Sequence, residues 1–120
     1  MTSLIRSEAL RLCNTVLWSW QGWRAAWRSE KTLRQWTLVN CASAALAFWL
    51  PLSGAERAVL LGLGLMVLVA ELLNTAIEEV VDYISLSQDP RAKKAKDCGS
   101  AAVAVAAIAG GLAWVVILLG

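Results

Sequence analysis

The stretch Leu65–Ile84, LMVLVAELLNTAIEEVVDYI, decides the fold, because it begins as an apolar membrane helix and ends as a charged one. At about 100° per residue, Glu71, Asn74, Glu78 and Asp82 fall within an arc of about 80°, so one helix face carries all four. Glu71 then lies about 16 Å below Asp82 along the helix axis. A carboxylate at that depth in a bilayer is costly unless it has a partner or water. The pattern indicates a chemical site near the inner surface of a membrane.

Two interpretations of this polar face remain open. It could be a hydrogen-bond network that holds an oligomer together, although one or two polar groups would suffice for that. We favour chemistry, with Glu71 as a general base and Glu78 as a ligand of Mg²⁺, which usually arrives with a nucleotide phosphate. Lys96 lies close to the next apolar run and could neutralise phosphate oxygens.

The run KDCGSAA suggests a second anion contact after Lys96. We expect Gly99 and Ser100 to open a helix and to offer free backbone amides to an anion. The chain contains no Walker A sequence and no HRD or DFG set. Any phosphoryl transfer must therefore use a site unlike those of the P-loop and protein-kinase folds.

The composition indicates a membrane protein, since 58% of the 120 residues are hydrophobic. A net charge of +2 argues against nucleic acid as a partner. The chain has no histidine, and its three cysteines show no CxxC spacing. This excludes the usual zinc sites and leaves a carboxylate or a lysine as the general base. We interpret the cysteines as small packing residues.

Hydrophobic periodicity predicts a single all-α membrane domain over residues 1–120. An amphipathic surface helix is expected at about 4–28, because its tryptophans fall on one stripe; a helix packed on protein is the alternative. Proline, serine and charged residues separate three further apolar runs. We predict membrane spans at about 33–50, 58–81 and 100–119, with a loop at about 85–96.

The distribution of lysine and arginine predicts the orientation. Six lie in the first 34 residues and four in the second loop, against Arg57 alone in the first loop. The positive-inside rule therefore places the N-terminus and the second loop in the cytoplasm and the C-terminus outside. Small residues at helical spacing in the last span predict close packing with other helices; they are Gly99, Ala102, Ala106, Gly110 and Ala113.

Three blocks, GWRAAWRSE, ELLNTAIEEVVD and AKDCGSAA, occur in this order. In sequence and separation they closely resemble the bacterial integral-membrane diacylglycerol kinase family, over about residues 11 to 119. The resemblance implies a homotrimer in the bacterial inner membrane, each subunit having three spans and an N-terminal surface helix. The implied reaction transfers the γ-phosphoryl group of magnesium-ATP to the hydroxyl of diacylglycerol and gives phosphatidic acid.

The resemblance also implies roles for individual residues. Glu71 resembles the general base, Asn74 and Asp82 supporting residues of the site, and Glu30 and Glu78 the magnesium ligands. The implied nucleotide positions are Arg11, Trp18, Glu30, Glu78, Ser87, Gln88, Asp89, Lys96 and Asp97. The implied lipid positions are Arg11, Trp20, Arg24, Ala25, Ala26, Trp27, Arg34, Gln35, Trp49, Glu71 and Ser100.

Helical projection places Arg11 and Trp18 about 20° apart and off the apolar stripe. The Trp18 ring could cover adenine while Arg11 approaches phosphate or lipid oxygens, and an exposed interfacial anchor is the alternative. Many relatives carry tyrosine at this tryptophan and some carry an acidic residue at Trp36. These differences could change the choice of lipid. The alternative is an undecaprenol kinase, with the same chemistry and a polyprenol acceptor, since related small kinases of Gram-positive bacteria share these motifs.

A conducting membrane protein is an alternative from a different class of function. An oligomeric proton or cation conductor could use Glu71 as a carrier of charge. It would need polar residues through the outer half of the span, and the stretch AVLLGLGLMVLVA at Ala58–Ala70 contains none. A purely structural subunit would leave the cytoplasmic carboxylates and Lys96 unexplained.

Overall fold

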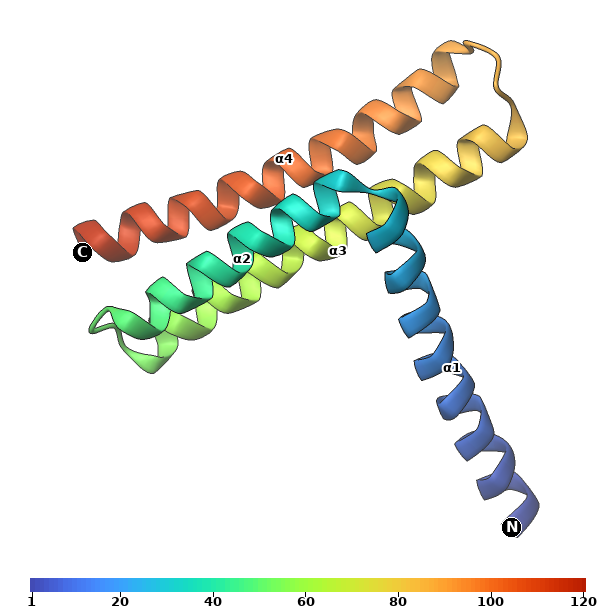
Figure 1. Cartoon of the computed structure of the whole chain (residues 1–120), viewed down its shortest axis with the longest axis horizontal. Helices are drawn as coiled ribbons and strands as arrows, with labels where there is room; N and C mark the ends of the chain where they lie inside the picture. The colour runs from blue at the N-terminus through green and yellow to red at the C-terminus, as the bar shows by residue number, and fades with distance from the viewer.

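The computed structural model describes all 120 residues as four helices joined by short connections, with no strand (Figure 1). The helices are α1 (Thr2–Ser29), α2 (Lys31–Trp49), α3 (Gly54–Ile84) and α4 (Pro90–Leu119). The all-α fold is therefore confirmed. The predicted surface helix and the three predicted spans all lie on helices.

Capping side chains set where α3 and α4 begin. Ser53 Oγ accepts a bond from the Glu56 amide at 3.1 Å, and Glu56 Oε1 accepts one from the Ser53 amide at 2.8 Å. This reciprocal pair is a capping box, which starts α3 four residues before the predicted span. At α4, Asp89 Oδ1 accepts a bond from the Arg91 amide at 2.7 Å, and Pro90 occupies the first turn.

The predicted loop at 85–96 is wrong in its second half, because α4 begins at Pro90 and only five residues connect it to α3. Asp89 is a favourable cap, proline suits the first helical position, and the alanines and lysines that follow are good helix formers. The prediction that Gly99 and Ser100 open a helix is also wrong. Both lie well inside α4, where the helix itself uses the backbone amides.

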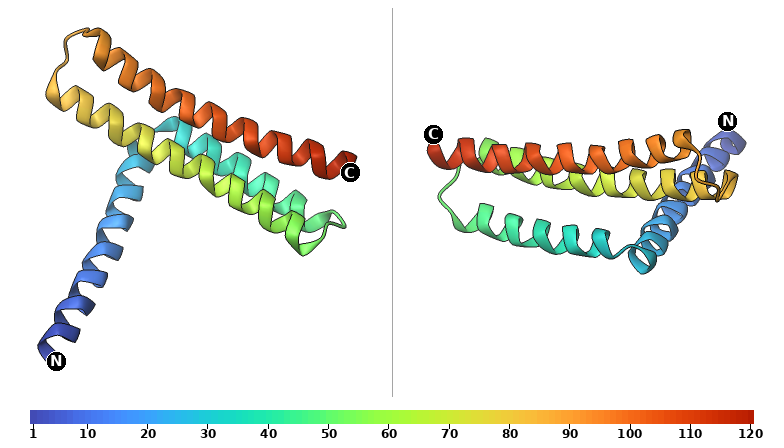
Figure 2. Two further views of the ribbon diagram at one scale, coloured as in Figure 1. Left: turned by 180° about the vertical axis from the view of Figure 1, so that it is seen from behind. Right: turned by 90° about the horizontal axis from the view of Figure 1, so that it is seen from above.

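Helices α2, α3 and α4 lie side by side, with α3 in contact with both others (Figures 1 and 2). Helix α1 contacts α2 and α3 only through its C-terminal part and extends away from the other three. Glu30 alone separates α1 from α2, and its extended backbone makes the bend between them. The polar end of α3, the start of α4 and the α1–α2 bend therefore lie in one half of the molecule.

Two helices, α3 and α4, are long and apolar enough to cross a membrane. Helix α2 does not meet that test, since Lys31, Arg34, Gln35 and Asn40 dilute its apolar surface. The span at 33–50 therefore stays a prediction. Only eight of the 120 residues are buried, and many large apolar side chains face outward from all four helices. Such a surface requires lipid or other protein around it.

A hydrogen bond joins α4 to α2 across the body of the bundle. The Trp114 indole Nε1–H donates to Ser43 Oγ at 2.9 Å. Both side chains are half-buried, and this bond gives the indole a partner within the apolar part of the chain. Thr37 on the same helix instead donates within α2, to the backbone oxygen of Leu33 at 2.8 Å.

We expect Ser43→Ala and Trp114→Phe each to lower the free energy of unfolding by roughly 1 kcal/mol, because each breaks the same interhelical bond. The double variant should lose about as much as either single one. Thr37→Ala is the matched control and should change little. Unfolding in detergent, followed by circular dichroism, measures all four variants, and additive losses would contradict the assignment of the bond.

Candidate functional site

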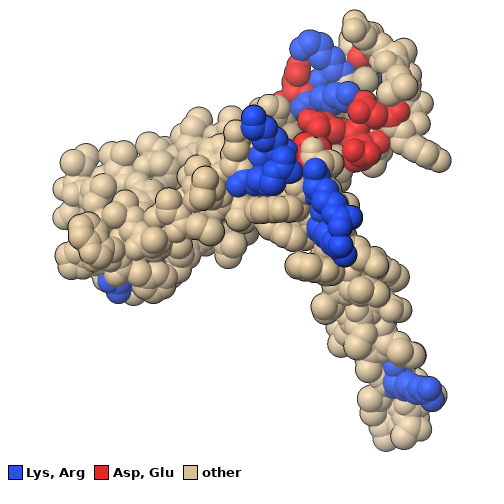
Figure 3. Space-filling model, in the orientation of Figure 1, with Lys and Arg blue, Asp and Glu red and all other residues tan.

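The polar face of α3 is present as predicted, and Glu71 is its deepest charged member. Glu71 is only 4% exposed and is the one charged residue that the chain buries. On the same face, Leu60 and Val67 are buried towards the other end of the helix. Glu78 is half-buried and Asp82 is exposed. Polarity and exposure therefore increase together towards the hairpin that α3 and α4 form through residues 85–89. Figure 3 shows the acidic side chains gathered at this end of the molecule, beside lysines and arginines.

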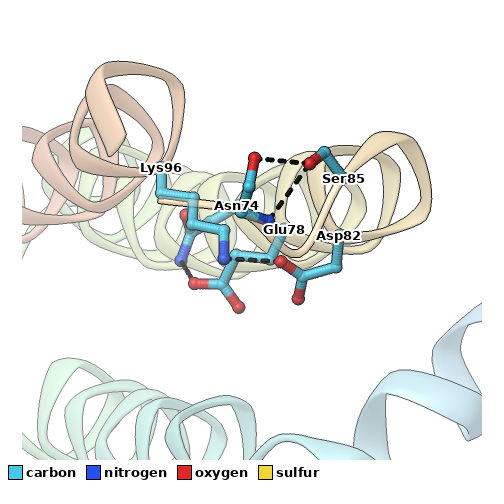
Figure 4. Close-up of polar contacts among 6 residues, drawn as sticks. Asn74, Glu78, Asp82, Ser85 and Lys96 are labelled. Carbon is cyan, nitrogen blue, oxygen red and sulfur yellow. Dashed lines mark hydrogen bonds and ion pairs between the residues drawn. The ribbon is translucent and has the colours of Figure 1, made fainter. Parts of the chain in front are cut away.

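Asn74 lies between Glu71 and Glu78 and touches α4. Its Nδ2 donates to Glu78 Oε1 at 3.4 Å (Figure 4), whereas its Oδ1 is buried and has no hydrogen-bond partner. This oxygen lies against Gly99 of α4, which is also buried. A Cβ atom on Gly99 would collide with Oδ1 and stand 3.3 Å from Asn74 Cγ. The glycine therefore allows α4 to approach α3 at the depth of the site.

Lys96 connects the two helices nearer the hairpin. Its Nζ donates to Asp82 Oδ1 at 2.6 Å (Figure 4). The hydrogen bond to Asp82 raises the pKa of Lys96 above its ordinary value, and the negative charge of Glu78 adds to the effect. The ammonium group, which lies outside the predicted span, is therefore charged at neutral pH. One turn away, Lys93 Nζ donates to Asp97 Oδ2 at 2.6 Å.

Glu30 brings the α1–α2 bend to the same region. Its negative charge and that of Glu78 both act on Glu71. Carboxylates from two parts of the chain are therefore close enough for their charges to interact. No three acidic or cysteine side chains converge tightly enough to hold a metal ion by themselves. Two carboxylates completed by phosphate oxygens and water would still be an ordinary oxygen set for Mg²⁺.

A cavity of about 630 Å³ lies under the α3–α4 hairpin. Five predicted nucleotide positions line it: Ser87, Gln88, Asp89, Lys96 and Asp97. Asp82 lines it as well, which joins the cavity to the polar face of α3. Sequence reasoning missed two further polar lining residues, Ser85 and Lys93. The spacing of four between Lys93 and Asp97 was the available signal, and it becomes visible once the segment is known to be a helix.

Several predicted positions do not join this site within one chain. Arg11 approaches Glu8 at 3.7 Å and Trp18 is exposed, both on the part of α1 that extends away. Trp49 is exposed at the far end of α2 from Lys31, and Ser100 is exposed on α4. The remaining exposed positions on α1 and α2 are Trp20, Arg24, Ala25, Trp27 and Gln35.

Three of the predicted lipid positions lie at the α1–α2 bend. The Arg34 guanidinium donates to the backbone oxygens of Trp27 and Arg28 and so caps the end of α1. Ala26 is buried in the part of α1 that approaches the bundle. Trp27 stacks on Trp23 with ring centroids 5.9 Å apart. These contacts stabilise the bend at which Glu30 lies.

Comparison with known proteins gives a consistent result. The family model described as prokaryotic diacylglycerol kinase matches residues 17–118. A diacylglycerol kinase of Pseudomonas aeruginosa is 44% identical over 92% of this chain and 89% of its own length. Diacylglycerol kinases of Escherichia coli K12 and Haemophilus influenzae are 36% and 35% identical, over 90% and 86% of this chain and 88% and 87% of theirs.

We expect Gly99→Ala to destabilise the protein by roughly 1–3 kcal/mol, because the new methyl group must displace the Asn74 side chain. Gly111→Ala on the same helix is the control, since its Cβ would meet nothing within 4 Å and it lies outside the predicted small-residue packing face. The control should be neutral or slightly stabilising, because alanine favours a helix over glycine. Replacing Asn74 by alanine in the Gly99→Ala background should recover stability. Equal unfolding midpoints for the two glycine variants would contradict the contact.

Proposed function

The chain belongs to the prokaryotic diacylglycerol kinase family, and we infer that it is a lipid kinase that phosphorylates diacylglycerol. The observation that carries this inference is the buried carboxyl group of Glu71. It shares a face of α3 with Asp82, which lines the polar cavity under the hairpin. A lipid alcohol can reach such a group from the membrane while a soluble phosphate donor approaches from the cytoplasm. As a kinase, the protein would use ATP as that donor.

We propose that Glu71 is the general base. Its carboxylate accepts the proton of the diacylglycerol hydroxyl as that oxygen bonds to the γ-phosphorus of ATP. The bond between the γ-phosphorus and the bridging oxygen breaks, and ADP leaves. In such a transfer most of the catalysis comes from positioning and from neutralising the charge on the transferred group.

Glu30 and Glu78 would hold Mg²⁺. The oxygen donors and the convergence of their charges on Glu71 fit a cation that is shared with phosphate oxygens. When bound, Mg²⁺ would neutralise negative charge on the nucleotide phosphates. Asn74 donates to Glu78 and so keeps that carboxylate oriented within α3.

The cavity under the hairpin is the proposed nucleotide site. Ser87, Gln88 and Asp89 form its rim and Lys96 supplies a positive charge inside it. Asp82 keeps the lysine beside the polar face of α3, where it can neutralise phosphate oxygens during transfer. Arg11 and Trp18 stand apart from this cavity, so a site that also uses them needs α1 from a second copy.

We further propose the membrane arrangement that the family resemblance implies. It is a homotrimer in the bacterial inner membrane with three spans per subunit, including α2. The hairpin and the N-terminus would be cytoplasmic, because the lysines and arginines gather there. The largely exposed apolar surface of the single chain supports burial against lipid and other copies.

Replacing Glu71 by glutamine should lower kcat by about 10²–10⁴-fold, which is the range for loss of a general base. ATP binding should be retained, because the amide keeps the size of the side chain. Glu79→Gln is the matched control, since Glu79 is the exposed neighbour of Glu78 and has no role in the proposed site. Transfer of labelled γ-phosphate to diacylglycerol in mixed micelles measures turnover, and full activity of Glu71→Gln would exclude the mechanism.

The same assay tests the acceptor when undecaprenol replaces diacylglycerol. We expect phosphate transfer to diacylglycerol to be the faster reaction for the wild-type protein. Transfer to the polyprenol alone would overturn the proposed substrate and leave the assignment of Glu71 intact.

A further inference from the structure

Lys93 is the lysine of the nucleotide cavity that the proposed mechanism does not use. It lines the cavity together with Lys96, one helical turn further along α4. Its ammonium group donates to Asp97 Oδ2 at 2.6 Å, as that of Lys96 does to Asp82. Each of two carboxylates that line the cavity is therefore neutralised by a lysine.

The Lys93–Asp97 pair contributes little to folding. The two side chains are 77% and 62% exposed, and exposed ion pairs contribute little to stability. Within the pair the lysine precedes the aspartate along the helix, which is the less stabilising order for an ion pair at this spacing. A lysine in the first turn of a helix is further disfavoured by the helix dipole, and that turn of α4 contains no acidic residue. Helix stability therefore does not account for Lys93.

The cavity is lined by three carboxylates and two lysines, so an anionic ligand has to contact the lysines. A polyphosphate in the cavity lies among Asp82, Asp89 and Asp97, which repel it unless they are paired. The hydrogen bond to Asp97 raises the pKa of Lys93, so the ammonium group is charged at neutral pH. Lys93 and Lys96 lie one turn apart on one cavity wall. Their ammonium groups can therefore contact different phosphates of the same polyphosphate.

We propose that Lys93 is a second phosphate-binding lysine of the nucleotide site, whose ammonium group exchanges Asp97 for the outer phosphates of ATP. This inference rests on the proposed function, because it takes the cavity under the hairpin as the ATP site. Hydrogen bonds from the hydroxyl or amino groups of the nucleoside then take the place of Lys93 at the Asp97 carboxylate, so this carboxylate stays paired beside the polyphosphate.

The test compares Lys93→Gln with Lys94→Gln. Lys94 is the neighbouring lysine on α4, carries the same charge on the same side of the membrane, and does not line the cavity. We expect Lys93→Gln to raise KM for MgATP about tenfold with kcat retained, as for loss of one charge-assisted hydrogen bond. Lys94→Gln should change KM no more than about twofold, and Lys93→Arg should restore most of the affinity.

Competition by AMP separates contact with phosphate from a structural role through Asp97. If Lys93 holds the outer phosphates, Lys93→Gln should leave the inhibition constant of AMP within about twofold of the wild type. Equal weakening of ATP and AMP would instead mean that Lys93 only positions Asp97, and would overturn the proposal. Equal KM values for the Lys93 and Lys94 variants would overturn it too.

The failure of this inference can be told from the failure of the proposed function. A wild-type protein that transfers phosphate to diacylglycerol, with unchanged KM in Lys93→Gln, would sink the inference alone. A wild-type protein that transfers no phosphate to diacylglycerol would sink the proposed function. Equilibrium dialysis with ATP then still reports whether Lys93→Gln weakens nucleotide binding and Lys94→Gln does not.

Discussion

Burial of the Glu71 carboxyl group is the constraint on which the rest of the structure depends. The chain buries few residues, and this is the only charged one among them. A carboxyl group buried among apolar helices costs free energy unless nearby groups or a ligand bind it through hydrogen bonds or opposite charge. From Glu71 towards the hairpin, the polar side chains of α3 become more exposed to solvent: Asn74 and Glu78 are half-buried and Asp82 is exposed. This gradient lets one helix connect the membrane interior with the aqueous cavity.

Close contacts between α3 and its neighbouring helices position the charged groups along this gradient. Gly99 allows α4 to approach Asn74, and Gly64 does the same for Asn40 of α2, where a Cβ atom would collide with the amide oxygen. Close approach near Gly99 places Lys96 within hydrogen-bond reach of Asp82. Capping of α1 by Arg34 stabilises the bend at Glu30, whose charge acts on Glu71. Small residues and one cap thus determine where the charged groups of the site meet.

The sequence predicts correctly which side chains share one face of α3, because helical periodicity determines this. The face of Glu71, Asn74, Glu78 and Asp82 follows from 3.6 residues per turn, so the structure agrees with it. The start of α4 was missed because a polar, charged run after a proline was interpreted as a loop, although Asp89 and Pro90 are also signals for a helix start. Contacts between helices, such as Trp114 with Ser43, depend on the register of two elements. One sequence does not define that register.

The central claim is that a lipid hydroxyl and a nucleotide meet at the buried carboxyl group of α3. Photolabelling tests this most directly, with a diacylglycerol analogue that carries a diazirine beside its free hydroxyl, in the presence of a non-hydrolysable ATP analogue. The account predicts that peptide mapping finds the label on the Glu71 and Asn74 face of α3, and that adding the nucleotide analogue strengthens it. Labelling confined to the outward-facing residues of that helix, such as Leu65 and Val69, would contradict the account.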